Sequence, residues 1–197
     1  DDDDDDDDDD GDGVSFKAYD DARFPFARRV HVHHHTRAVT ALAVDRAGAR
    51  FAAGGFDYRV TLYDFGGMNG DFRPFRSWEP WEGYPIVALS YSPSGELLVV
   101  APSGSQAKVY TRDGELVGEC KKGDTYLYDM SNTKGHTSHI TCAAWHTRDR
   151  RTLLTASVDC TLREWHADAL ERANHRLFVC KDAASRKVAV TACAYGA

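Results

Sequence analysis

The residues of this chain most able to do chemistry lie close together in its C-terminal third. They are an imidazole at His136, a carboxylate at Asp159, an indole N–H at Trp165 and a hydroxyl at Thr155 or Ser157. Groups of this kind either transfer protons in catalysis or hydrogen-bond one another as a buried polar network. The spacing favours a network, because Asp159 stands in a turn before a strand that ends near Trp165. We therefore interpret these residues as structural and predict no catalytic residue.

The elements that position these groups are three runs of alternating apolar and polar residues within residues 135–166. Such runs, separated by turns, are typical of adjacent antiparallel strands. A Gly-His pair opens the segment, and a Ser-Val-Asp turn followed by a Trp six residues later closes it. These features resemble the WD repeat of β-propellers, in which the polar network fixes how the strands of one blade stack.

Two further copies of this unit precede it, at residues 36–64 and 86–119. Strands in and before these copies are expected at residues 30–35, 39–44, 51–53, 86–91, 97–101, 107–110 and 115–119. In the first copy, the places of the histidine, aspartate and tryptophan are taken by His35, Asp57 and Tyr63. The other copy has no Gly-His pair, so only two of the three copies are expected to contain the network.

Residues 190–195 repeat the first strand of the other copies and open a fourth copy that ends almost at once. Propellers close with about four to eight blades of four strands each. The sequence therefore predicts an all-β WD-repeat β-propeller of about three blades plus the start of a fourth. We interpret this incomplete ring as a fragment, the N-terminal part of a larger propeller, and as a truncated gene model more than a natural terminus.

The acidic charge is concentrated at one end of the chain. Eleven of the first twelve residues are Asp, and removing these charges from the net charge of −7 leaves +4 for residues 13–197. A block of like charges repels itself and cannot form a core. We therefore predict a disordered acidic tail and linker at residues 1–29, followed by a partial propeller at residues 30–197. Two roles are open for the tail: an electrostatic arm toward basic partners such as histones, or a tail that only keeps the protein soluble.

The remaining sequence argues against several classes of protein. Neither a signal peptide nor a long apolar run indicates secretion or a membrane partner. The five cysteines are odd in number and lack CxxC spacing, as expected for reduced thiols in the cytosol or nucleus. There is no GxSxG, P-loop, HExxH or GxGxxG motif, so we expect no enzyme, no cofactor and no small-molecule substrate.

Three charged or histidine-rich groups are interpreted as surface features. The histidines within residues 31–35 suggest a metal site, but no cysteine or carboxylate joins them at a ligand spacing, so a solvated strand end is favoured. The charged run at residues 148–151 is interpreted as a hairpin turn rather than a phosphate contact. The lysines are too scattered for direct nucleic-acid binding. They are Lys121, Lys122, Lys134 and Lys181.

Residues 72–81 and 122–137 are not demanded by a propeller and are expected to be insertions on its rims. Loops of this kind are where rigid scaffolds commonly bind partners. The aromatic residues in and beside the two insertions are Trp78, Trp81, Tyr84, Tyr126 and Tyr128. Two interpretations are open: these side chains pack the insertions against the blades, or they form a partner surface.

Two runs are more specific than any repeat signature: SQAKV at residues 105–109 and DMSNTKGHT at residues 129–137. They resemble the gastrulation-defective family of WD-repeat proteins, and the resemblance covers about residues 30–197. It implies a nuclear, non-enzymatic protein that associates with chromatin at DNA double-strand breaks and supports histone ubiquitination alongside a cullin-RING ligase. The alternative is a WD-repeat scaffold in RNA processing or another nuclear assembly. Both interpretations imply protein partners and nuclear localisation.

The sequence departs in one respect from the pattern of propellers that dock on cullin-ligase adaptors. Propellers that dock on cullin-ligase adaptors often carry Trp-Asp-x-Arg after the third strand of a blade. The corresponding positions here read Trp-His-Ala-Asp at residues 165–168 and Tyr-Asp-Phe-Gly at residues 63–66. Neither has the arginine, so this stretch of sequence gives ligase docking no support.

Overall fold

The computed structural model describes residues 31–68, 72–127, 129–130 and 132–196. Val32–Ala197 forms one compact unit. The predicted acidic tail at residues 1–29, and with it the predicted boundary at residue 30, lies outside the described residues. Within the described ranges, no helix is long and apolar enough to cross a membrane.

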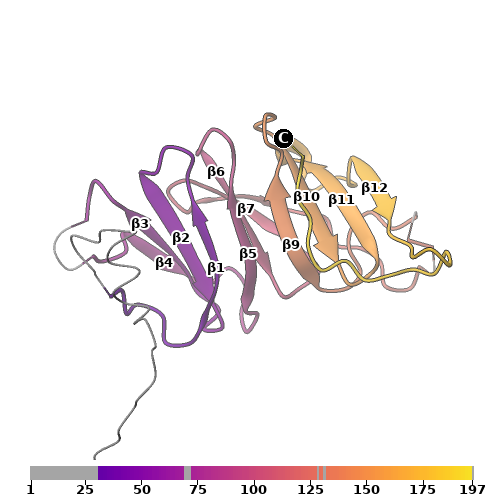
Figure 1. The fold of residues 1–197 in the computed structure, drawn as a ribbon, viewed down its shortest axis with the longest axis horizontal. Coiled ribbons are helices and arrows are strands. Elements are labelled where there is room, and N and C mark those ends of the chain that lie inside the picture. The colour runs from indigo at the N-terminus through magenta and orange to yellow at the C-terminus, as the bar shows by residue number, and fades with distance from the viewer. Residues whose placement is uncertain (1–30, 69–71, 128, 131, 197) are drawn as a thin grey trace, which may run out of the picture. The chain divides into compact units, whose positions relative to one another are not determined.

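The described residues form three antiparallel sheets, and each contains four strands that are consecutive in sequence (Figure 1). Blade 1 contains β1 (Val39–Val44), β2 (Arg50–Gly55), β3 (Val60–Asp64) and β4 (Arg76–Trp78). Blade 2 contains β5 (Ile86–Tyr91), β6 (Leu97–Pro102), β7 (Lys108–Thr111) and β8 (Leu116–Glu119). Blade 3 contains β9 (Ile140–Trp145), β10 (Thr152–Ser157), β11 (Thr161–His166), the 3-10 turn η1 (Ala167–Ala169) and β12 (Arg176–Val179). The prediction of an all-β fold with three propeller blades is confirmed.

The strand predictions need correction at the blade edges. Residues 31–35, predicted as most of a strand at residues 30–35, have no regular structure. An alternating run becomes a strand only beside a partner, and the outer edge of blade 1 is already occupied by β4. This strand lies inside residues 72–81, so that segment is not wholly an insertion: it supplies the fourth strand of the blade. Neither β4 nor β12 is predicted by the sequence pattern, because β4 spans only three residues and β12 (RLFV) does not alternate apolar and polar residues.

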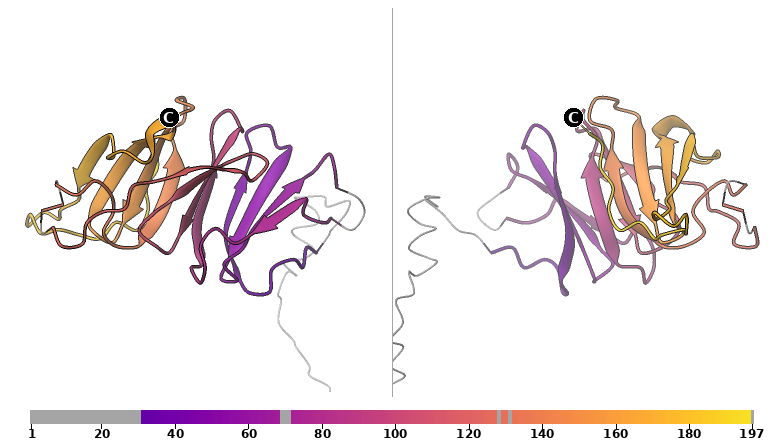
Figure 2. Two further views of the ribbon diagram at one scale, coloured as in Figure 1. Left: turned by 180° about the vertical axis from the view of Figure 1, so that it is seen from behind. Right: turned by 45° about the vertical axis from the view of Figure 1, so that its right-hand side comes forward.

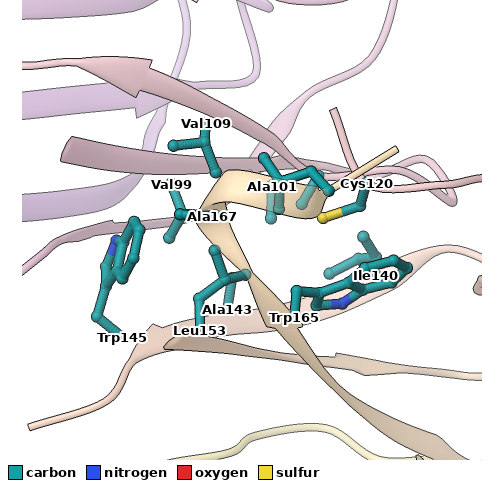
Figure 3. Close-up of a cluster of buried hydrophobic side chains, with 12 residues drawn as sticks. Val99, Ala101, Val109, Cys120, Ile140, Ala143, Trp145, Leu153, Trp165 and Ala167 are labelled. Atoms are coloured by element: carbon teal, nitrogen blue, oxygen red, sulfur yellow. The ribbon is translucent and has the colours of Figure 1, made fainter. Parts of the chain in front are cut away.

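The core lies between the blades. One cluster of buried side chains joins blades 1 and 2 and includes Leu62 and Ile86. A second joins blades 2 and 3 and includes Val99, Trp145 and Trp165 (Figure 3). Successive side chains of a strand point to opposite faces, so blade 2 buries one face against blade 1 and the other against blade 3.

The first strand of each blade shows this arrangement in its exposed fractions. Leu89 in β5 and Ala143 in β9 face the preceding blade and are only 8% and 5% exposed. Leu42 occupies the equivalent position in β1 and is 67% exposed, and Val44 is also exposed. Among the described residues no blade precedes β1, so this apolar face of blade 1 is open.

Residues 190–195 run alongside β9 (Figure 2). Thr141 Oγ1 donates to the Val190 carbonyl at 2.6 Å, just as Thr40 of β1 donates to the Ile86 carbonyl of β5. The segment therefore occupies the position of the first strand of a fourth blade. It forms no ladder, because the first strand of a blade pairs only with the second strand of its own blade.

Candidate interaction surface

The polar side chains of blade 3 form a continuous buried relay. Nδ1 of His136 lies 3.0 Å from Oδ2 of Asp159, and Nε2 lies 2.8 Å from Oγ1 of Thr155. The indole N–H of Trp165 donates to the same Thr155 oxygen at 2.8 Å. The relay joins β10, β11, the turn between these strands and the loop before β9, so it fixes how the blade is stacked.

Burial sets the protonation of the relay. It lowers the pKa of His136, and the hydrogen bond to Asp159 offsets only part of that effect, so the imidazole is neutral at neutral pH. Burial acts to raise the pKa of Asp159, but hydrogen bonds from His136, Thr161 and the Thr137 backbone lower it to about 2. A neutral imidazole that donates from Nδ1 accepts a hydrogen bond from the Thr155 hydroxyl at Nε2. The hydrogen bonds then run in one direction, from Trp165 through Thr155 and His136 to Asp159.

The sequence allowed either Thr155 or Ser157 to supply the hydroxyl of the relay. The structure assigns that role to Thr155, and Ser157 makes other hydrogen bonds. Its Oγ donates to the carbonyls of Ser138 and His139, at 3.2 and 2.9 Å, and accepts the backbone N–H of Asp159 at 3.2 Å. Ser157 therefore holds the turn that carries the aspartate, while the contact with the imidazole belongs to Thr155.

Blade 1 builds its relay from a different strand. His35 lies 2.9 Å from Asp57 through Nδ1 and 2.7 Å from Thr61 through Nε2. The hydroxyl comes from β3, because Ala53 stands on β2 where blade 3 has Thr155. The side chain of His35 is only 7% exposed, which corrects the expectation of a solvated strand end for this histidine. No group of three metal-ligating side chains occurs among the described residues.

The relay of blade 1 stops short of its aromatic residue. Tyr63 stands at the place of Trp165, but its buried hydroxyl makes no hydrogen bond among the described residues. Its ring instead stacks on Phe51, with the ring centroids 4.3 Å apart. Tyr63 therefore contributes to blade 1 through packing.

Arg163 of β11 is a functional residue that the sequence reasoning does not identify. Its side chain is completely buried. The guanidinium donates to the carbonyl and hydroxyl of Thr133 at 2.8 and 2.6 Å, to the Met130 carbonyl at 3.1 Å and to Oδ1 of Asn174 at 2.6 Å. The only signal in the sequence is that Arg163 shares a strand face with Trp165, two residues away, and is therefore expected inside.

The loop between β8 and β9 is held in place by this arginine and by close contact between its first and last residues. The N–H of Gly123 donates to the His136 carbonyl at 2.9 Å. A Cβ atom at Gly135 would lie 1.7 Å from the Lys121 carbonyl oxygen. The glycine of the Gly-His pair is thus required here by close backbone approach. The loop is clamped at its base on both sides.

The tip of the same loop is exposed. Tyr126 is 96% exposed, and Leu127 beside it is also open to solvent. Lys122, near the start of the loop, lines a small pocket of about 90 Å³. The other lining residues are Trp81, Tyr84, Gly104, Ser105 and Gln106. We call the pocket residues Trp81, Tyr84, Gln106 and Lys122, together with Tyr126 at the tip of the loop, the rim surface.

The aromatic residues singled out by the sequence do not share one environment. Trp78 packs on Tyr110, with ring centroids 5.0 Å apart, and adjoins the core between blades 1 and 2. Trp81 lies beneath the ammonium of Lys108, 3.9 Å from the ring centroid. Tyr84 and Tyr126 are exposed, and Tyr128 lies outside the described residues.

Comparison with known proteins places this geometry in a family. The protein-family model described as WD domain, G-beta repeat matches residues 27–64 and 128–166. WD repeat-containing protein 70 of Bos taurus is 39% identical over 173 residues, which cover 88% of this chain and 26% of the relative. The Gastrulation defective protein 1 homolog of Drosophila melanogaster is 46% identical over 143 residues, which cover 73% of this chain and 22% of the relative. This chain is a WD-repeat protein homologous to WD repeat-containing protein 70.

A more distant relative has the same repeats. An uncharacterized WD repeat-containing protein of Schizosaccharomyces pombe is 31% identical over 153 residues, which cover 74% of this chain and 26% of the relative. The predicted resemblance to the gastrulation-defective family is therefore confirmed. The chain spans about a quarter of the length of these relatives. WD-repeat domains generally mediate protein–protein interaction, and the fold of this chain is consistent with that role.

Proposed function

We propose that this chain is part of a non-enzymatic scaffold that binds partner proteins through the rim surface. The observation that carries the proposal is the β8–β9 loop. Its base is fixed by the buried Arg163, whereas its tip presents Tyr126 almost fully to solvent. Aromatic side chains on a rigid support are typical hot spots of protein interfaces, because little conformational entropy is lost when they are buried.

The setting proposed for this scaffold is the nucleus, in chromatin at DNA double-strand breaks. The support is the likeness of the SQAKV and DMSNTKGHT runs to the gastrulation-defective family, which implies histone ubiquitination alongside a cullin-RING ligase. Docking on the ligase is assigned to parts of the full-length protein beyond this stretch, because no Trp-Asp-x-Arg motif follows the third strand here.

The test compares tagged full-length protein with a Tyr84→Ala/Tyr126→Ala double variant and a Leu116→Ala control. Leu116 is an exposed residue of β8 outside the rim surface. The wild type and the control are expected to be nuclear, to accumulate at induced breaks and to co-purify with cullin-RING subunits. The double variant is expected to lose the partners that bind through the rim surface, to retain the cullin-RING subunits and to keep its melting temperature.

Two results would redirect the proposal. Co-purification of the wild type with an RNA-processing complex, and no accumulation at breaks, would favour the alternative scaffold. Equal partner recovery from the wild type and the double variant would remove the rim surface from the interface.

A further inference from the structure

The interface between blade 3 and the strand that follows it contains a facing pair of cysteines. Ala41, Ala88 and Cys142 occupy equivalent positions in the first strands of the three blades, on the side toward the next blade. Leu89 and Ala143 occupy the next position, on the side toward the preceding blade. Ala41 lies in the same core cluster as Leu89, and Ala88 in the same cluster as Ala143.

The same arrangement recurs at the third interface with cysteine on both sides. Residues 190–195 lie along β9, and Cys193 stands where Leu89 and Ala143 stand in the earlier blades. The thiol of Cys142 donates to the Cys193 carbonyl, with Sγ 3.6 Å from the oxygen. Within the described residues both cysteines are partly exposed.

A hydrogen bond between the two thiols shifts their pKa values in opposite directions. The hydrogen bond from Cys193 lowers the pKa of Cys142 to about 6, although burial acts in the opposite direction. The same hydrogen bond, together with burial, raises the pKa of Cys193. Two interacting thiols lose their protons in separate steps, and the first thiolate is the nucleophile.

We propose that Cys142 and Cys193 form a redox site that closes a disulfide between blade 3 and the next strand in the presence of peroxide. The Cys142 thiolate attacks one oxygen of hydrogen peroxide, the O–O bond breaks, and the hydroxide released is protonated to water. The Cys193 sulfur then attacks the sulfenic sulfur of Cys142. The S–S bond forms, the S–O bond breaks, and the departing hydroxide takes the Cys193 proton as a second water. Two thiols are oxidised and one peroxide is reduced.

The other cysteines give this site its controls. Cys120 is completely buried in the core between blades 2 and 3, where burial raises its pKa and leaves it unreactive. Cys160 and Cys180 lie beside one another at the far end of blade 3, where the N–H of Cys180 donates to the Cys160 carbonyl at 2.8 Å. Burial raises the pKa of Cys180, which makes this thiol a poorer nucleophile than that of Cys142.

Peptide mapping of the full-length protein tests the proposal. Trypsin places the cysteines of this stretch in separate peptides: residues 113–121, 135–148, 152–163, 177–181 and the peptide that begins at Val188. After limited peroxide and alkylation under denaturing conditions, peptide 135–148 is expected to be joined to the peptide that begins at Val188. Alkylation of Cys142 and Cys193 should be lost together and restored by dithiothreitol.

Single variants separate the two roles. In Cys193→Ser, Cys142 is expected to proceed to sulfenic and then sulfinic acid, without a cross-link. In Cys142→Ser, Cys193 should remain alkylatable, and Cys160→Ser should leave the cross-link unchanged. Oxidation of the wild type that stops at sulfenic acid, or a cross-link between peptides 152–163 and 177–181 instead, would overturn the proposal. The readout requires no partner protein, so its outcome is independent of the proposed scaffold function.

Discussion

Nδ1 of His136 lies 3.0 Å from the Asp159 carboxylate, and both side chains are almost completely buried. Each is the partner that makes burial of the other tolerable, because an unpaired buried polar group keeps its full desolvation cost. We therefore expect His136→Ala or Asp159→Ala to lower the free energy of unfolding by about 1–3 kcal/mol. The double variant should lose less than the sum of the single losses. Strictly additive losses in a denaturation double-mutant cycle would show that the pair does not interact.

The same histidine predicts a pH dependence of stability. Burial lowers the pKa of His136 in the folded protein, so the unfolded chain binds a proton that the folded chain does not as pH falls below about 6.5. The free energy of unfolding should therefore fall as the solution is acidified from neutral pH. Asp159, whose folded pKa is about 2, adds a further loss only in strong acid, below its usual value of 3.8.

Urea unfolding of the full-length protein at several pH values between 7.5 and 5.5 measures this effect. The slope of stability against pH, at most about 1.4 kcal/mol per unit from one group, should be smaller in His136→Asn than in the wild type. His175, an exposed histidine after η1, supplies the matched control His175→Asn. Identical slopes in all three proteins would assign the pH dependence to other groups.

Arg163 is predicted to control the order of the β8–β9 loop. Arg163→Lys keeps a charge but cannot reach Thr133, Met130 and Asn174 at once, since an ammonium lacks the planar fork of a guanidinium. We expect a loss of about 2–4 kcal/mol, because buried carbonyls lose their donors. Trypsin should also cleave faster in the loop, after Lys122.

Limited proteolysis followed by mass spectrometry detects that cleavage. The control is Arg172→Lys, which makes the same substitution at an exposed residue that follows η1. Unchanged cleavage within residues 121–134 in Arg163→Lys would show that the loop is ordered by other contacts.

Because the apolar face of blade 1 is exposed, Leu42→Lys should have opposite effects in residues 13–197 expressed alone and in the full-length protein. Residues 13–197 expressed alone should associate through exposed side chains such as Leu42. Leu42→Lys should reduce this association in light scattering. In the full-length protein the same change should destabilise the fold by about 2 kcal/mol or more, because we expect another blade to bury this position.

Leu116→Lys, on the exposed outer strand β8, is the control for both chains. It should change neither the association nor the stability appreciably. A sharp two-state melt from a clean monomer of residues 13–197 at high concentration would contradict the expectation that the blade faces are sticky.

The acidic tail predicts binding that depends strongly on salt. Carboxylates packed as densely as those of residues 1–12 attract basic chains over a Debye length of about 8 Å at physiological salt. Histone recovery in a pull-down should fall when residues 1–12 are deleted, and the difference should vanish as salt rises. Equal recovery from both proteins at every salt concentration would leave the tail a solubilising role.

The sequence by itself determined the blades and most of the relay. Each blade is built from consecutive strands, so alternation and turns within about forty residues are enough to reveal it. His136 and Asp159 are placed by the same local pattern, since one stands just before the first strand and the other in the turn before the third.

Only the tertiary structure decided the contacts between segments distant in sequence. The hydroxyl of the relay comes from β10 in blade 3 and from β3 in blade 1, a choice that depends on which strand has a threonine facing the imidazole. The clamp by Arg163 joins residues about thirty positions apart, and Cys142 meets Cys193 across a blade interface. Periodicity reports which face of a strand is buried, but the residue that it meets there is set by how the blades pack.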